Sequence, residues 1–165
     1  MKHRLLSAAA LAAMALPLAA QTSAPPSIPP SQMITATTMR ATSNELLQKA
    51  RAAKDGIAFK VLLERPDGQE QLAVRVKSGQ GEWHRDVADI LIGLEGEAEI
   101  VTGGTVVNAK ETAPGEKRGD GVQNGKRQPF RAGDAIRIEP QTPHQILLKP
   151  GTSFSYFVVK VRAGQ

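Results

Sequence analysis

The chain has 165 residues, a length that suits one domain, and its formal charge at neutral pH is +5. It has no cysteine, which excludes disulfides and an acylated lipoprotein, so stability must come from an ordinary apolar core. One Trp, one Tyr and four Phe provide no aromatic set for stacking on bases, and charges of both signs are interspersed. These features argue against nucleic acid as a partner.

The first twenty residues have the pattern of a secretory signal peptide. A positive start at Lys2 and Arg4 precedes an apolar run from Leu5 that ends in small residues suited to cleavage after Ala20. Cleavage removes two positive charges, and the formal charge falls from +5 to +3. We expect a periplasmic or secreted protein with no stable membrane insertion after cleavage, since the apolar run is short for a retained anchor.

Two segments precede the main domain. Residues 21–42 are rich in Pro, Ser and Thr, which predicts a flexible linker. A short helix is predicted at residues 43–55, because Thr42 and Glu45 have the spacing of a capping box and Gly56 provides a stop. An apolar Leu and Ala stripe on this helix predicts that it packs against the outside of the domain.

From residue 56 to residue 163 the periodicity changes to that of strands. Short apolar or alternating segments are separated by Gly and Pro turns, and Gly103-Gly104 has the form of a two-residue hairpin turn. No helix pattern lies between the strands, so the region predicts an all-β sandwich or barrel. The predicted strands are 57–63, 72–76, 90–94, 98–102, 105–107, 135–138, 145–148 and 154–161, with a further one around Phe130.

Residues 108–128 are polar and rich in glycine, and they predict a long loop. A loop of this length within a compact domain is usually functional or disordered. Two interpretations stay open: a lid over a cavity, or a solvated insertion.

Two histidines and two carboxylates stand out within the strand-rich region. Glu82 and His84 share one face of a strand, because side chains alternate along it, and Asp89 follows across a short turn. His144 arrives from far along the chain, directly after Pro143 has stiffened its approach. Imidazoles and carboxylates are ligands of first-row metal ions, so Glu82, His84, Asp89 and His144 predict a metal site.

These residues resemble the motifs of the cupin family. The family's first motif is His-x-His-x(3–4)-Glu-x(6)-Gly, and here Glu82-x-His84-x(4)-Asp89-x(6)-Gly96 has the same spacing. The second motif, with its glycine, proline, glycine and histidine, is matched from Gly133 through Pro140 to His144. The resemblance covers residues 57–162. It implies a jelly-roll barrel (a double-stranded β-helix), here preceded by the short N-terminal helix.

Three positions depart from the family pattern. Glu82 stands at the first histidine, Asp89 at the glutamate, and Gln141 at the glycine of the second motif. The implied metal role therefore passes directly to His84 and His144, to Asp89 with a shorter side chain, and to Glu82 by position. A glutamate ligand makes the site harder and more anionic, which favours Mn²⁺, Fe²⁺ or Zn²⁺.

Three functions are open on this basis. The first is a metal-dependent enzyme acting on a small molecule, since two histidines and carboxylates leave open positions on an ion. The second is a non-catalytic cupin that binds a small molecule or sugar. The third is an interaction module of the cell envelope. A homodimer is also expected, because proteins with this resemblance commonly pair their sheets.

Overall fold

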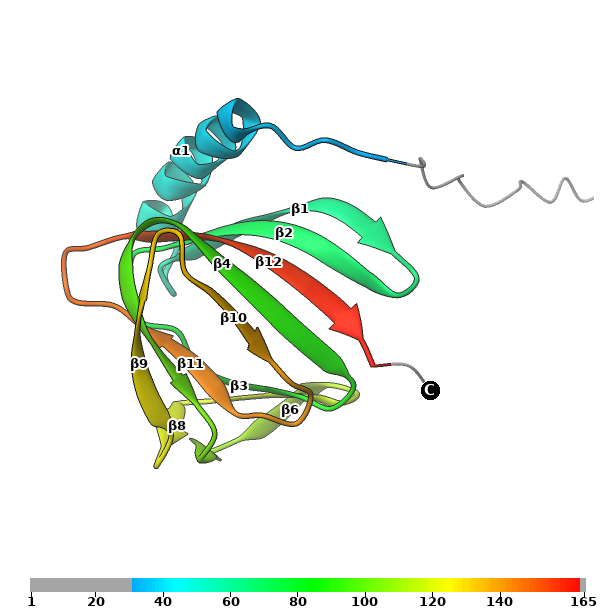
Figure 1. The fold of residues 1–165 in the computed structure, drawn as a ribbon. Coiled ribbons are helices and arrows are strands. Elements are labelled where there is room, and N and C mark those ends of the chain that lie inside the picture. Colours follow the sequence, from blue (N-terminus) through cyan, green and yellow to red (C-terminus); the bar gives the residue numbers. More distant parts are fainter. Residues whose placement is uncertain (1–30, 164–165) are drawn as a thin grey trace, which may run out of the picture. The chain divides into compact units, whose positions relative to one another are not determined.

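The protein is described here by a computed structural model that covers residues 31–163, in which strands predominate (Figure 1). The elements in chain order are α1 (Ala36–Ala52), β1 (Ile57–Arg65), β2 (Gly68–Arg75), β3 (Gly81–His84), β4 (Val87–Thr102), β5 (Thr105–Val107), β6 (Lys110–Ala113), β7 (Glu116–Gly119), β8 (Gly121–Gln123), β9 (Lys126–Arg131), β10 (Ala135–Ile138), β11 (His144–Leu147) and β12 (Phe154–Arg162). The predicted signal peptide and residues 21–30 of the predicted linker lie outside the described residues.

Strand β4 joins the two faces of the barrel. Its first half pairs with β12 and β10, and β12 continues through β2 to β1. Its second half pairs with β11 and β9, and β11 continues through β3 and β7 to β6. All these pairings are antiparallel, so one long strand carries the sheet from one face of a curled barrel to the other. The predicted all-β jelly-roll barrel is confirmed.

The two strands predicted at 90–94 and 98–102 are in fact one strand. The separating residue Gly96 has φ +83°, and the register with β12 shifts between Ser155 and Tyr156. Glycine accepts this φ without strain, so β4 bends there instead of turning back. The bend lets one strand serve both faces.

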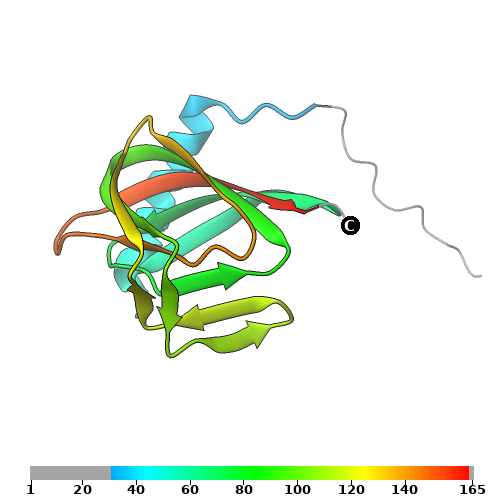
Figure 2. The ribbon, with the colours of Figure 1, turned by 60° about the horizontal axis from the view of Figure 1, so that its bottom comes forward.

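Two further predictions are wrong. The chain turns at Gly103-Gly104, but β5 pairs with β8 and not with β4, so this is not a simple hairpin. Residues 108–128 are not a long loop, because they contain β6, β7, β8 and the start of β9. Figure 2 shows the β6–β7 hairpin in yellow-green at the lower edge. Strand β6 is exposed, and β7 and β8 bury no apolar side chain. Backbone pairing therefore defines these strands, and the hydrophobic pattern does not reveal them.

The main core fills the space between the two faces of the barrel. Phe130 packs edge-on against Phe154, which stacks on Tyr156. The other buried members of this core are Ala73, Leu91, Ala98, Ile100, Ile138, Ile146 and Val158. They come from β2, β4, β10, β11 and β12, so the core depends on segments that are distant in the sequence.

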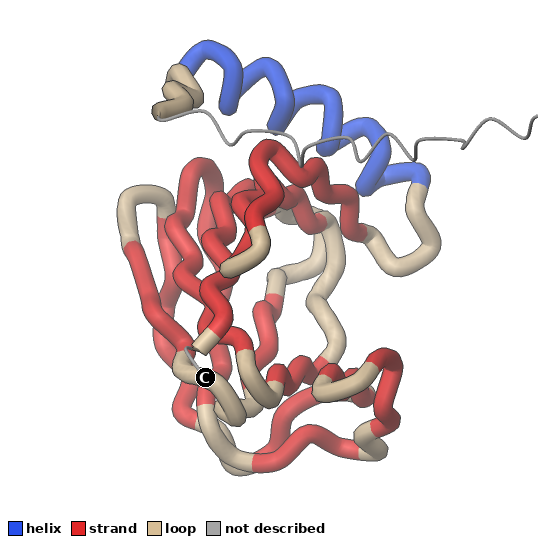
Figure 3. Tube along the Cα trace, turned by 90° about the vertical axis from the view of Figure 1, so that its right-hand side faces the viewer, coloured by secondary structure: helices blue, strands red, loops and turns tan. Residues whose placement is uncertain are grey.

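Helix α1 lies outside the strand layers, against β1 and β2 (Figure 3). Leu46 packs with Leu72 and Val74, and the hydroxyl groups of Ser43 and Ser155 hydrogen-bond at 2.7 Å. The predicted packing face is therefore confirmed.

The predicted bounds of the helix, residues 43–55, are displaced. The helix begins at Ala36 and ends at Ala52, so it takes in the last part of the predicted linker, residues 21–42. Its N-cap is Thr35, whose hydroxyl accepts a hydrogen bond from the Thr38 N–H, and Thr42 is a buried residue inside the helix. Residues 36–44 contain several Ser, Thr and Asn residues, whose low helix propensity hides the helix in the sequence. Packing of Thr42 and Ser43 against the sheet outweighs this low propensity in the folded protein. No helix within residues 31–163 has the length and apolar character needed to cross a membrane.

Strand β1 is an edge of the sheet and carries exposed apolar side chains. Phe59 is 58 % exposed and Val61 is 39 % exposed. The last strand differs, because Phe154, Tyr156 and Val158 are buried in the core. Of the first and last strands, β1 is therefore the one with a large exposed aromatic residue.

Candidate metal centre

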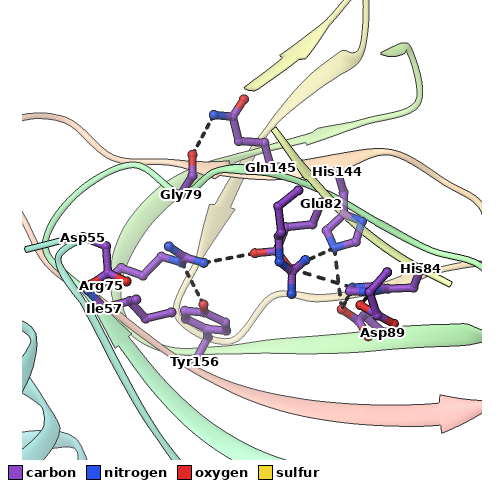
Figure 4. Close-up of polar contacts among 12 residues, drawn as sticks. Asp55, Ile57, Arg75, Gly79, Glu82, His84, Asp89, His144, Gln145 and Tyr156 are labelled. Atoms are coloured by element: carbon purple, nitrogen blue, oxygen red, sulfur yellow. Dashed lines mark hydrogen bonds and ion pairs between the residues drawn. The ribbon is translucent and has the colours of Figure 1, made fainter. Parts of the chain in front are cut away.

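The structure brings the four predicted ligands together. Glu82 and His84 lie on β3, Asp89 on β4 and His144 at the start of β11, which pairs with β3, and the four side chains point toward one another (Figure 4). One donor atom from each residue lies within 4.8 Å of all the others. His84, Asp89 and His144 are buried, whereas Glu82 is partly exposed.

The spacing of the donor atoms suits a small cation. Asp89 Oδ2 lies 3.2 Å from His84 Nε2 and 3.6 Å from His144 Nε2, and Glu82 Oε2 lies 3.8 Å from each Nε2 atom. Ligands held at about 2.0–2.2 Å from an ion are roughly 3.0–3.5 Å apart in tetrahedral or octahedral geometry. Three of these four separations exceed that range by only a few tenths of an ångström, and the donor set fits a first-row divalent ion.

Both histidines are oriented through their second ring nitrogen. His144 Nδ1 lies 3.0 Å from the carbonyl oxygen of Thr142, which can only accept a hydrogen bond, so the proton is on Nδ1. His84 Nδ1 forms a short hydrogen bond with the Glu116 carboxylate. Such contacts fix the tautomer and ring orientation of metal-binding histidines. They leave both Nε2 atoms directed at the centre.

A backbone contact holds the two motifs together. The N–H of Gln141 donates to the carbonyl oxygen of His84 at 2.6 Å, and the Trp83 Nε1–H donates to the carbonyl oxygen of Gln141 at 3.0 Å. Gln141 has φ +63°, in the left-handed region that favours glycine. Gln141, which stands at the family's glycine position, therefore has a backbone conformation that glycine usually adopts. The loop still places His144 beside the other three candidate ligands.

Glu82 is held by two arginines. Its Oε1 atom accepts a hydrogen bond from Arg75 Nη2 at 3.2 Å, and its Oε2 atom accepts one from Arg118 Nη1 at 2.6 Å. Arg75 also donates from Nε to the Tyr156 hydroxyl at 2.9 Å. Burial opposes ionisation of Glu82, but the positive charges of Arg118 and Arg75 outweigh it and lower its pKa. Glu82 is therefore an ionised carboxylate with one oxygen near the histidines.

Asp89 contacts a lysine as well as the histidines. Lys160 Nζ lies 2.8 Å from Oδ1 and 3.0 Å from Oδ2, and 3.4 Å from His84 Nε2. Burial would raise the pKa of Asp89, but its contacts with His144 and His84 and the charge of Lys160 hold that pKa well below the usual range. The carboxylate is thus ionised and already paired with a cation.

A cavity of about 510 Å³ adjoins the centre. Glu82, Asp89 and His144 form part of its wall, so a bound small molecule would lie against the candidate metal ligands. This volume is within the range of small-molecule sites in proteins. The cavity is the space in which any chemistry at the centre would take place.

Sequence reasoning found the four central residues but not those that surround them. Arg75, Glu116, Arg118 and Lys160 reach the centre from β2, β7 and β12. Glu116 and Arg118 fall within the segment interpreted as a loop, which concealed their alternation on β7. Lys160 had one detectable signal, because it is the single charged residue in the mostly apolar run from Phe154 to Val161.

Comparison with known proteins supports the fold. No protein-family model and no curated protein match the sequence. The chain is similar in structure to an uncharacterised conserved protein with a double-stranded β-helix domain from Klebsiella pneumoniae subsp. pneumoniae MGH 78578. That likeness has 17 % identity and a TM-score of 0.53, and it covers 81 % of this chain and 92 % of that one.

Two further structures are weaker matches. A Cupin 2 conserved barrel domain protein from Salinispora arenicola CNS-205 has 21 % identity and a TM-score of 0.47, with 68 % of this chain and 84 % of that one covered. KdgF from Halomonas sp. has 16 % identity and a TM-score of 0.48, and the likeness covers 67 % of this chain and 84 % of that one. With its two-faced antiparallel barrel and the two motifs meeting inside it, the protein has the cupin-type double-stranded β-helix fold.

Proposed function

We propose that the protein binds one divalent first-row metal ion through His84, Asp89 and His144, with Glu82 as a fourth ligand. One observation carries this proposal. Two Nε2 atoms and a carboxylate converge at the same point, and both Nδ1 atoms are engaged by acceptors that fix the rings. Two imidazoles make Mn²⁺, Fe²⁺ or Zn²⁺ more suitable than Mg²⁺ or Ca²⁺, which prefer all-oxygen sites.

The proposal extends to an enzyme that acts on a small molecule in the adjoining cavity. Two histidines and a carboxylate leave coordination positions open on a six-coordinate ion, and the cavity borders the same side chains. A metal ion in such a site polarises a bound oxygen group or lowers the pKa of bound water. The residues of the chain orient the ion and supply charges around the ligand.

Metal analysis tests the proposal directly. The protein is purified without affinity-metal exposure, reconstituted with Mn²⁺, Fe²⁺ or Zn²⁺, and analysed by inductively coupled plasma mass spectrometry. Near-stoichiometric metal is expected, with loss in His84→Ala and His144→Ala. Asp86→Ala is the matched control, because this exposed carboxylate on the neighbouring turn pairs with Arg85 and not with the centre. Metal-free protein after reconstitution, or metal retained in both histidine variants, would refute the proposal.

A metal-free small-molecule binder is the second candidate. Lys160 pairs with Asp89, and Arg75 and Arg118 pair with Glu82, so the carboxylates of the centre are compensated without a metal ion. This observation favours the metal-free binder. A ligand that raises the thermal unfolding midpoint equally with and without chelator, and that is never turned over, would identify this function.

We propose further that the protein is exported and dimeric. The support for export is the charge and apolar pattern of residues 1–20. Cell fractionation and the mass of the mature protein test export, with cleavage after Ala20 expected.

The support for the dimer is the exposed Phe59 on the edge strand β1. Light scattering that finds a monomer would refute the dimer, and with it the envelope interaction module that pairs through its sheets.

A further inference from the structure

We propose that the cavity beside the metal centre takes a small organic acid, an ionised carboxylate carried on an apolar body, and that Arg118 recognises the carboxylate. This inference names the ligand class for the proposed small-molecule function and rests on that function. It is carried by the free hydrogen-bonding capacity of Arg118, the local pairing of the anions around it and the apolar side of the same cavity.

The wall of the cavity is rich in charged side chains that nearly balance. Its cationic side chains are Arg65, Arg75, Arg118, Lys160 and Arg162, and its anionic ones are Glu64, Glu82, Asp89 and Glu116. Arg65 pairs at 3.2 Å with Glu70, which lies outside the wall, so four cations and four anions remain before any metal binds. A divalent ion would add two positive charges. With an ion bound, the cavity would concentrate anions and disfavour cations, because field lines are focused in a partly enclosed space.

Three of the four anions are already engaged. Glu82 contacts Arg75 and Arg118, Asp89 contacts Lys160, and Glu116 contacts His84. The charges of Glu82 and Asp89 are therefore neutralised locally and offer little repulsion to an incoming carboxylate. Arg162 and Glu64 have no side-chain hydrogen bond or ion pair within residues 31–163, so their opposite charges leave no surplus on the wall.

Arg118 has hydrogen bonds to spare. Its Nη1 atom donates to Glu82, while its Nε and Nη2 atoms have no acceptor in the described part of the chain. Its side chain is 30 % exposed and lines the cavity. A planar guanidinium with free donors matches the two oxygens of a carboxylate. Because Glu82 lies beside both histidine Nε2 atoms, a carboxylate on Arg118 would also be near the metal ligands.

Buried apolar side chains form another part of the cavity wall. Ala73, Leu91, Ile146, Tyr156 and Val158 all line it and also belong to the main core. A fully polar ligand would leave these groups without favourable contacts. An apolar body of a few carbon atoms or one ring would cover them, which is the usual composition of a small-molecule site.

Isothermal titration with two probes of the same shape tests the inference. The probes are 3-phenylpropionate and its neutral amide, 3-phenylpropionamide. The metal content of every sample is measured, and titrations use both chelator-treated and reconstituted protein. We expect the carboxylate to bind at least about tenfold more tightly than the amide. We expect Arg118→Gln to abolish this preference, because binding of the carboxylate weakens more than binding of the amide.

Two further variants separate recognition from folding. Arg118→Lys keeps the charge and should retain part of the preference even if Arg118→Gln is destabilised by weaker support of Glu82. Arg127→Gln is the matched control, because Arg127 is exposed on β9, lies outside the cavity wall and pairs only distantly with Glu99. It should bind both probes as the unaltered protein does.

The outcomes distinguish this inference from the metal proposal. Equal affinity for the two probes, no binding of either at millimolar concentration, or a preference that survives in Arg118→Gln would overturn the inference even if metal is bound. A carboxylate preference that depends on Arg118 in protein that never takes up metal would support the inference and refute the metal proposal alone.

Discussion

The ammonium group of Lys160 lies 2.8 Å from Oδ1 and 3.0 Å from Oδ2 of Asp89, so a cation of the protein already occupies both oxygens of a candidate metal ligand. The two residues are directly opposite in the β12–β4 pairing. A metal ion bound to Asp89 must displace or share this contact. Lys160 is therefore the counter-charge of Asp89, and it would compete with an incoming ion.

Replacing Lys160 with methionine should strengthen metal binding by about tenfold or more, because the competing positive charge is removed. Without metal the same variant should be less stable by about 3–5 kcal/mol, since the buried Asp89 carboxylate loses its cation. Calorimetric titration with Zn²⁺ and denaturant unfolding in chelator measure the two effects. Lys149→Met, which alters an exposed lysine, is the control. Unchanged or weaker metal affinity would contradict the competitor role.

Glu116 should matter for metal affinity although it is not a ligand. It holds His84 Nδ1, and loss of such a contact typically weakens metal binding by about 10- to 100-fold. Glu116→Gln is the test, with the dissociation constant for Zn²⁺ as the measurement. Glu99→Gln on the exposed part of β4 is the control. If Glu116→Gln binds as tightly as the unaltered protein, the orientation of His84 does not depend on this carboxylate.

The contribution of Glu82 to stability should depend on pH. Its pKa in the folded protein lies below the ordinary value of 4.5, despite burial, because of Arg118, His144 and Arg75. A lowered pKa stabilises the folded state fully above the unfolded value, and this stabilisation is lost as pH falls toward the folded pKa. In chelator-treated protein, Glu82→Gln should therefore be destabilised at pH 7, and the difference should shrink below about pH 4.5.

Denaturant unfolding at pH 7, 5 and 3.5 measures this dependence on the unaltered protein and Glu82→Gln. Glu99→Gln should follow the unaltered protein throughout, because its carboxylate is exposed and its nearest arginine contact is 3.8 Å long. A difference between the unaltered protein and Glu82→Gln that stays constant, or grows, toward acidic pH would show that Arg75 and Arg118 do not stabilise the Glu82 carboxylate.

The buried hydroxyl of Tyr156 should stabilise the arginine that holds Glu82. It accepts a hydrogen bond from Arg75 Nε at 2.9 Å, so Tyr156→Phe leaves a buried charged donor without its partner. A loss of about 1–3 kcal/mol in the free energy of unfolding is expected. In an Arg75→Met background the same change should cost much less. Equal costs in the two backgrounds would show that the two residues are not coupled.

Helix α1 should contribute to the stability of the barrel through Leu46. This side chain is 2 % exposed and packs with Leu72 and Val74, so Leu46→Ala should cost about 2–5 kcal/mol. Gln48→Ala, on the exposed face of the same helix, should change stability by less than about 0.5 kcal/mol. Similar unfolding midpoints for the two variants would show that the helix does not pack firmly on the sheet.

Much of the barrel follows from local patterns. Strands β1, β2, β10, β11 and β12 have apolar or alternating sequences, and the predicted segments overlap them. Strands β6, β7 and β8 were not predicted, because they bury no apolar side chain and pairing of their backbones defines them. The continuity of β4 through Gly96 is another feature without a local signal, since a glycine marks a bend and a turn equally well.

The sequence contains the identity of the central donors, because histidine and carboxylate spacing reflects strand alternation and a short turn. That spacing points to Glu82, His84 and Asp89, and the resemblance to the second family motif adds His144. Their surroundings depend on the three-dimensional pairing of β2, β3, β7 and β12, which brings Arg75, Glu116, Arg118 and Lys160 to the same point from distant parts of the chain. Long-range strand register sets these contacts, and a one-residue shift would turn each side chain away from the centre.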